Sequence, residues 1–194
     1  MIELRCKNCN SKEMRYLGGI WVCNACGSNF IPEENENPPI DKKEEKLVES
    51  LVEAYGKFEE YDPIVTDNFE KWERLESNVE TAFKRLKDYN PNNAWLFVVA
   101  MLNCIRMGFK SADDACKIVY YAGRALELSN SDDLFDIKQS LEPNFMYYKD
   151  KLVDLNPILE EQADRIADCI MNKRSMKRPR LDYDVTNEYE PFYY

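Results

Sequence analysis

Four cysteines near the N-terminus constrain this chain more than any other feature of its sequence. They form two Cys-x-x-Cys pairs, Cys6 with Cys9 and Cys23 with Cys26. Within each pair the two thiolates converge on one ion, and the backbone amides between them turn toward the sulfurs. Two pairs complete a tetrahedral shell of four sulfurs, which is the closed arrangement of a structural zinc site. We therefore predict one structural zinc ion with these four ligands.

The segment between the two pairs predicts a β-hairpin. Residues 13–17 alternate polar and apolar side chains, Gly18-Gly19 is a turn dipeptide, and residues 20–22 resume as a strand. Asn10 and Gly27 each follow a cysteine pair, at positions where a positive φ is tolerated. The spacing of the pairs and the hairpin between them therefore agree with one another.

The cysteines leave two other interpretations open. Disulfides form in oxidising compartments, but the first ten residues have no apolar signal-peptide core. Iron also binds four sulfurs, although a single four-cysteine site on a hairpin favours zinc.

Cys104, Cys116 and Cys169 fall in apolar helical patterns, so we expect buried, inert thiols there. All seven cysteines fit a reducing setting, so we expect a cytoplasmic protein, or a nuclear one in a eukaryote.

The cysteine pairs, the hairpin and Gly27 together resemble a zinc ribbon, of the type found in transcription factor IIB and many small prokaryotic proteins. The resemblance covers residues 1–31. The first pair departs from the common Cys-Pro-x-Cys-Gly form, because Lys7 and Asn10 stand in those places. Ribbons serve in transcription factors, ribosomal proteins, enzymes and adaptors. The resemblance therefore implies a fold and a metal, and it does not imply one function.

Charge is distributed unevenly along the 194 residues, whose net charge is −10. Residues 1–31 carry four basic residues against two acidic ones, a net +2, which leaves −12 for the remainder. An acidic body disfavours broad nucleic-acid binding, because phosphate contacts need a cationic face. We therefore expect any phosphate contact and base stacking to be made by the ribbon. The candidate nucleic-acid-contacting residues are Arg5, Lys7, Lys12, Arg15 and Trp21. The alternative is that these charges are a solvated face and that Trp21 packs across the hairpin.

Most of the chain beyond the ribbon predicts helices. Residues 32–40 form a polar, proline-bearing linker, and residues 41–174 form a helical domain. Helices are expected to begin near residues 41, 67, 93, 111, 132, 144 and 156, about seven in all. Residues 95–102 are apolar almost all round, so the helix containing them should be the buried core helix, Leu102 included. A strand over residues 96–99 is the weaker alternative.

Part of this helical domain resembles a tetratricopeptide repeat. Residues 90–95 resemble the join between two such repeats, and residues 113–115 and 125–128 resemble pieces of the repeat's second helix. The resemblance spans about one repeat. The predicted fold class is therefore mainly α, with a small β-hairpin zinc ribbon followed by an α-hairpin, tetratricopeptide-like bundle. An irregular helical bundle is the alternative.

The last twenty residues, 175–194, form a tail in two blocks. Residues 177–180 are basic and resemble a nuclear import signal, although we favour a role at the C-terminus of a helix. Residues 181–194 hold five aromatic and four acidic residues and no basic one. We expect this tail to dock on a partner chain or on the cationic ribbon, away from the acidic helices. The candidate partner-binding residues are Tyr183, Tyr189, Phe192, Tyr193 and Tyr194.

Three classes of function compete for this sequence. The first is a non-enzymatic zinc-binding adaptor, which we favour because ribbon, helical scaffold and tail all suit protein partners. The second is a nucleic-acid-associated factor that uses the ribbon. The third is an enzyme, but the sequence has no glycine-rich phosphate loop, no nucleophile elbow and no histidine. No apolar run is long enough to span a bilayer, so we expect no membrane partner.

Overall fold

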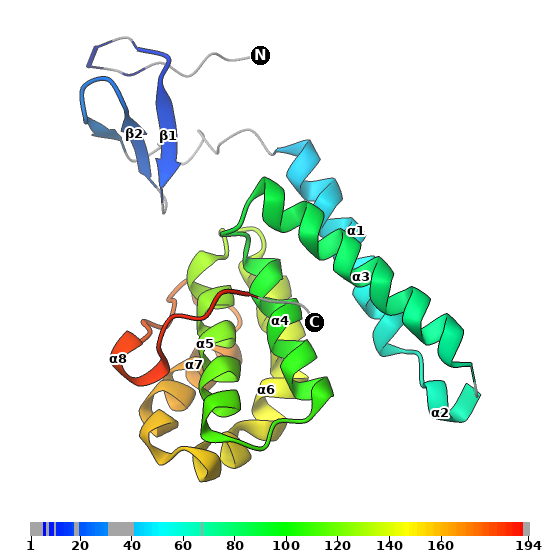
Figure 1. Ribbon diagram of the computed structural model, residues 1–194. Coiled ribbons are helices and arrows are strands. Elements are labelled where there is room, and N and C mark those ends of the chain that lie inside the picture. The colour runs from blue at the N-terminus through cyan, green and yellow to red at the C-terminus, as the bar shows by residue number, and fades with distance from the viewer. Residues whose placement is uncertain are drawn as a thin grey trace. The chain divides into compact units, whose positions relative to one another are not determined.

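The computed structural model describes residues 6, 8–9, 11–17, 20–30, 41–66 and 68–191 of the chain. The chain divides into two compact units, residues 1–42 and residues 43–194 (Figure 1). The predicted linker, residues 32–40, lies outside the described residues.

The first unit contains a three-stranded antiparallel sheet. Its strands are β1 (Met14–Leu17), β2 (Ile20–Cys23) and β3 (Asn29–Phe30), in the order β1-β2-β3. The β1–β2 pairing runs from Met14 opposite Cys23 to Leu17 opposite Ile20, which is a hairpin over the segment predicted to form one. The turn residues Gly18 and Gly19 themselves lie outside the described residues. Sequence reasoning missed β3, since a two-residue strand leaves no periodicity to detect.

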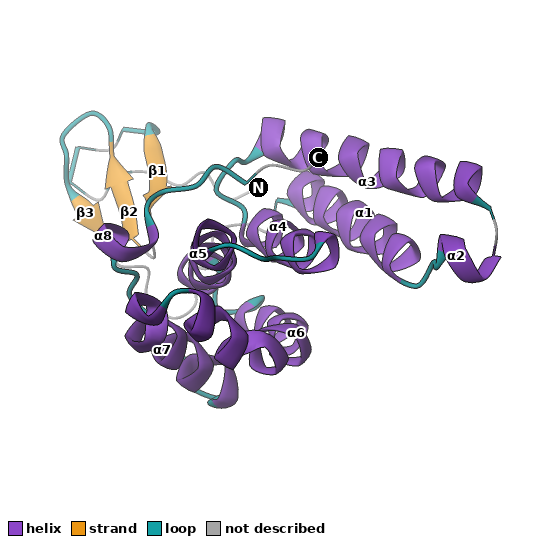
Figure 2. Cartoon of the chain, turned by 60° about the horizontal axis from the view of Figure 1, so that its bottom comes forward, coloured by secondary structure: helices purple, strands orange, loops and turns teal. Residues whose placement is uncertain are grey.

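The second unit is helical (Figure 2). Ser111 and Asp114 form a capping box at the start of the helix that was expected to begin near residue 111, and Asn93 and Asn156 cap the helices that follow them. No helix in the described part of the chain is both long and apolar enough to cross a membrane. The elements are α1 (Lys42–Glu59), α2 (Pro63–Thr66), α3 (Phe69–Tyr89), α4 (Ala94–Met107), α5 (Ala112–Leu128), α6 (Leu134–Leu155), a 3₁₀ turn (Pro157–Leu159), α7 (Glu160–Met171) and α8 (Tyr183–Thr186).

Helices α1 and α3 lie side by side as a long hairpin whose tip is α2 (Figures 1 and 2). Phe58 of α1 packs against Trp72 of α3, with ring centroids 5.7 Å apart. Arg106 at the end of α4 joins this hairpin to the rest of the unit. Its guanidinium lies 3.8 Å from the centre of the Phe58 ring and donates a 2.8 Å hydrogen bond to the Phe58 carbonyl. The Arg106 guanidinium thus covers the Phe58 ring at the C-terminal end of α1.

The core helix is α4, as the sequence predicts. Its residues from Leu96 to Met101 are all buried, so the apolar run is helical and covered by neighbours on several sides. Leu102 departs from the prediction, because it is only partly buried. With Trp95, Val98 and Val99 it lines an open groove of about 280 Å³ between α1, α4 and α6. The pattern was right for the helix but wrong for Leu102 and Trp95, which are both only partly buried.

The two short helices predicted over residues 132–141 and 144–154 are one continuous helix, α6, with Pro143 inside it. A proline at an interior position removes one backbone hydrogen bond and usually breaks a helix. Here Leu141 and Phe145, on either side of Pro143, are both fully buried in the core. Packing of these side chains holds both halves of the helix in line. The described part of the chain therefore has six long helices where seven were expected.

The described part of the tail folds onto the helical unit, which contradicts the expectation that it docks elsewhere. Leu181, Thr186 and Pro191 are buried, and Tyr189 packs on Tyr120 of α5, with ring centroids 5.6 Å apart. Residues 181–191 are thus the last structural element of this unit. Phe192, Tyr193 and Tyr194 lie outside the described residues.

Candidate metal centre

The four N-terminal cysteines come from two loops at one end of the small sheet. Cys6 and Cys9 precede β1, Cys23 ends β2, and Cys26 lies in the turn that leads to β3. The loops are fixed by backbone hydrogen bonds, from Cys6 N to Ser11 O at 2.8 Å and from Cys23 N to Ser28 O at 3.0 Å. Gly27 adopts φ 70°, a left-handed conformation that glycine reaches without strain. The β1–β2 pairing brings the two loops together.

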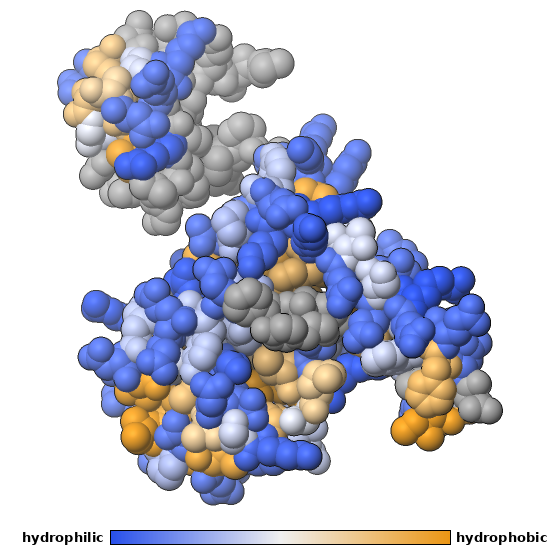
Figure 3. Space-filling model, in the orientation of Figure 1, coloured by the Kyte–Doolittle hydropathy of each residue, from blue (hydrophilic) through white to orange (hydrophobic). Residues whose placement is uncertain are grey.

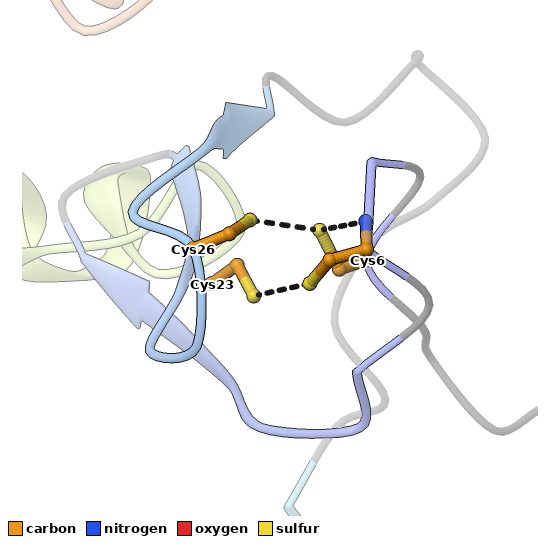
Figure 4. A group of neighbouring side chains, drawn as sticks. Cys6, Cys23 and Cys26 are labelled. Atoms are coloured by element: carbon orange, nitrogen blue, oxygen red, sulfur yellow. Dashed lines mark hydrogen bonds between the residues drawn. The ribbon is translucent and has the colours of Figure 1, made fainter.

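The four sulfur atoms converge on one point (Figure 4). All four Sγ atoms lie within 4.8 Å of one another. Across the two loops, Cys6 Sγ is 3.6 Å from Cys26 Sγ, and Cys9 Sγ is 3.5 Å from Cys23 Sγ. A tetrahedron with zinc–sulfur bonds of about 2.3 Å has edges of about 3.8 Å. The donor set therefore fits a tetrahedral metal ion, and no other group of the described residues forms such a cluster.

Backbone and side-chain donors surround the sulfurs. The amides of Asn8 and Cys9 each point at Cys6 Sγ from 3.4 Å, as expected where a thiolate charge must be neutralised. Ser28 Oγ lies 3.2 Å from Cys26 Sγ and accepts a 3.0 Å hydrogen bond from Asn8 Nδ2. Ser28 thus links the first loop to the second. Sequence reasoning did not single out Asn8 or Ser28, because their polar side chains are ordinary in a turn.

The two exposed thiols differ in acidity. Hydrogen bonds from the side chain and backbone of Ser28 lower the pKa of Cys26 to about 6. The Ser11 backbone lowers the pKa of Cys9, but hydrogen bonding with Cys26, burial and the other two thiols outweigh it and raise that pKa to about 12. Such a divergence is expected when several thiols share one small space, since only some can ionise without a cation between them. A bound cation removes this conflict.

The remaining cysteines are separate from the cluster. Cys116 and Cys169 are buried and Cys104 is partly buried, and none forms a disulfide. Burial raises the pKa of Cys104 to about 11. The prediction of enclosed core cysteines is therefore confirmed for Cys116 and Cys169, whereas Cys104 is only half-covered.

The predicted nucleic-acid set is only partly described. Lys12 and Arg15 are exposed in the first unit, so they are accessible to a ligand. Trp21 lies in β2, but its side chain, like Arg5 and Lys7, falls outside the described residues. The structure therefore brings together the four cysteines, and of the cationic set it places only Lys12 and Arg15, both on the surface.

Of the predicted partner-binding tyrosines, the two that the structure describes, Tyr183 and Tyr189, contact the chain itself. Tyr183 stacks edge-on against Tyr120, with centroids 6.2 Å apart, and its hydroxyl lies 3.2 Å from Arg124 Nη1. Tyr189 donates a 2.9 Å hydrogen bond from its hydroxyl to Asp113. These two residues hold the tail on α5.

No protein-family model, curated protein or solved structure matches this chain.

Proposed function

We propose that this chain is a non-catalytic zinc-binding adaptor, in which a four-cysteine zinc ribbon is attached to a helical unit that binds a protein partner. The observation that carries the proposal is the convergence of four Sγ atoms within 4.8 Å on two loops of one small sheet. Four thiolates fill a tetrahedral shell and leave no position for a substrate or a catalytic water. The ion would then hold the two loops together and take no part in a reaction.

Zinc is favoured over other ions by the donors and by the size of the site. Sulfur donors in a tetrahedral set select zinc or iron over magnesium and calcium. The Cys6–Cys26 and Cys9–Cys23 separations of 3.6 and 3.5 Å suit a single ion at about 2.3 Å from each sulfur. A hairpin carrying two such loops and a short third strand supports the resemblance to a zinc ribbon.

The helical unit supplies the surface for a protein partner. The groove between α1, α4 and α6 is lined mainly by apolar side chains, including Val52, Trp95 and Leu102. Exposed apolar grooves between helices commonly receive a partner's helix or extended segment. The α4–α5 helical hairpin also supports the weaker resemblance to one tetratricopeptide repeat, a module that offers such grooves.

The metal is tested by analysis of the purified chain. We expect one zinc ion per chain by native mass spectrometry and elemental analysis. Cys9→Ser should lose the ion, since it removes one of the four donors. The matched control Cys104→Ser should keep it, because Cys104 is a separate, half-buried thiol on α4. A chain that binds no ion at micromolar zinc would refute the metal assignment.

Nucleic-acid binding through the ribbon is the second candidate, favoured by the exposure of Lys12 and Arg15. It predicts an affinity for single-stranded or duplex nucleic acid that falls steeply with salt, and a weaker salt slope in Arg15→Gln. The adaptor proposal predicts instead that binding to a protein partner is lost in Leu102→Asp, which places a charge in the groove. Fluorescence anisotropy across a salt series separates the two candidates.

A further inference from the structure

The tip of the α1–α3 hairpin is an exposed apolar surface. Ile64 and Val65 in α2 are 82% and 81% exposed, and Phe69 at the start of α3 is 58% exposed. Figure 3 shows a hydrophobic patch, with hydrophilic residues beside it, at the end of the α1–α3 hairpin where Figure 1 places α2. Three large, exposed apolar side chains within six residues are unusual at the end of a hairpin unless another surface covers them. We use the name tip for residues 59–70, which contain Ile64, Val65, Phe69 and the charged residues beside them.

The tip is a built structure. Asp62 Oδ1 accepts hydrogen bonds from the amides of Ile64 and Val65 at 2.8 and 3.3 Å. The Tyr61 hydroxyl donates a 2.9 Å hydrogen bond to the Asn68 carbonyl across the turn. These bonds hold α2 in a fixed conformation with Ile64 and Val65 exposed, so little conformational entropy is lost when a partner binds.

The charge around the tip is of one sign. Residues 59–70 contain five acidic residues and no lysine or arginine. The two lysines that flank this segment each have a partner within the same chain. Lys57 pairs with Glu53 at 2.5 Å, and Lys71 lies 4.8 Å from the centre of the Tyr61 ring. Glu59 and Glu60 are exposed. The surface that covers the tip should therefore be both apolar and cationic.

The same unit carries a surface of that kind. Residues 171–180, which begin at the end of α7, contain five lysines and arginines and no acidic residue. Met171 and Met176 there are 60% and 51% exposed, and methionine side chains adapt to irregular apolar partners. Lys173 pairs with Glu142 and Arg178 donates to the Ser129 carbonyl, whereas Arg174, Lys177 and Arg180 are exposed. We call residues 171–180 the basic patch.

We propose that the tip of one copy of this chain docks on the basic patch of a second copy, which joins copies head to tail. The two segments are complementary in charge, since residues 59–70 contain five acidic residues and residues 171–180 contain five basic ones, and both expose apolar side chains. Both are small, so the contact belongs to the weak, transient class of interfaces. Contacts between unlike surfaces close into rings or extend into chains according to the rotation between the copies.

Charge reversal on each surface tests this proposal. The tip variant is Glu59→Lys with Glu60→Lys, and the patch variant is Arg174→Glu with Lys177→Glu. By sedimentation equilibrium at low salt, the average mass of the wild-type chain should rise above 22.9 kDa with concentration. Each variant alone should stay at the monomer mass. An equimolar mixture of the two variants should associate again. The unchanged basic patch of the tip variant is complementary in charge to the unchanged acidic tip of the patch variant. The reversed tip and the reversed patch are also complementary in charge to each other.

Two controls complete the experiment. Glu49→Lys with Glu80→Lys changes the net charge as the tip variant does, on exposed positions of α1 and α3 away from the tip, so it should associate like the wild type. Raising the salt from about 0.05 M to 0.5 M should weaken association by about tenfold or more, since the charges lie on the surface. Circular dichroism verifies that each variant is folded. A wild-type chain that stays monomeric overturns the proposal, and so does a mixture of the two variants that does not associate. Either result overturns it even if the tip is found to bind a different basic protein.

Discussion

Removal of the metal from the intact chain should unfold the small sheet and leave the helical unit folded. The sheet has strands of four, four and two residues, and domains below about 40 residues rarely fold without a metal or a disulfide. Structural zinc contributes about 10–16 kcal/mol to such modules at neutral pH. The helical unit has its own core, built from residues between Leu51 and Leu181, so it does not depend on the ion.

Two probes distinguish the units in this experiment. On addition of a strong chelator, amide NMR signals of residues 11–30 should collapse to unfolded positions, while the helical circular dichroism and its thermal midpoint stay unchanged. Cys23→Ser should do the same without chelator, because Cys23 is a fully buried donor, and Cys169→Ser should not. Acidification should also release the ion, since metal binding requires thiolates. A sheet that keeps its NMR dispersion without metal would contradict this account.

The convergence of the four cysteines could be predicted from the sequence because it depends on local structure. Two Cys-x-x-Cys pairs and a hairpin of fixed length determine how the four sulfurs meet, so no distant part of the chain is needed. Helix starts were predictable for the same reason, as in the capping box at Ser111 and Asp114. The continuity of α6 through Pro143 depends instead on Leu141 and Phe145 packing into one core, which no local rule reveals.

The position of the tail was missed because net charge was taken as a guide to a local surface. The helical unit is acidic overall, yet cations stand where the tail passes. Arg124 lies 3.2 Å from the Tyr183 hydroxyl, Lys117 lies 5.8 Å from the centre of the Tyr189 ring, and Lys87 lies 3.5 Å from the Glu190 carboxylate. An average over the surface hides such a row of charges.

Buried polar contacts also hold the segment that leads into the tail. Lys138 of α6 is fully buried and donates hydrogen bonds of 2.9 and 2.8 Å to the carbonyls of Asn172 and Ser175. The Glu127 carboxylate accepts a 2.9 Å hydrogen bond from the Leu181 amide. A buried lysine is costly unless its donors are satisfied, so these bonds fix the chain where it leaves α7. Leu181 is thereby positioned over α5.

Replacing Leu181 by alanine should destabilise the helical unit by about 2–5 kcal/mol, as for other buried leucines. The side chain is only 5% exposed, and it packs directly over Gly123 of α5. A Cβ atom on Gly123 would lie 2.2 Å from Leu181 Cδ2, so glycine at this position makes room for the leucine. Thermal and urea unfolding of the isolated unit, residues 43–194, measure the loss. A change below about half a kcal/mol would mean that the tail is not part of the folded core.

The glycine itself gives a sharper test of the same contact. In a helix, Gly→Ala normally stabilises by about 1 kcal/mol. Gly56 in α1 is the matched control, since a Cβ there would meet no atom within 4 Å, and Gly56→Ala should show that gain. Gly123→Ala should instead destabilise by about 1–3 kcal/mol, because the added methyl overpacks the site.

In a Leu181→Ala background the obstruction is gone, so Gly123→Ala should become neutral or stabilising. This reversal of sign in a double-mutant cycle requires direct contact between the two positions. Equal gains at Gly56 and Gly123 in the wild-type background would show that Leu181 does not occupy the place on α5 that the structure gives it.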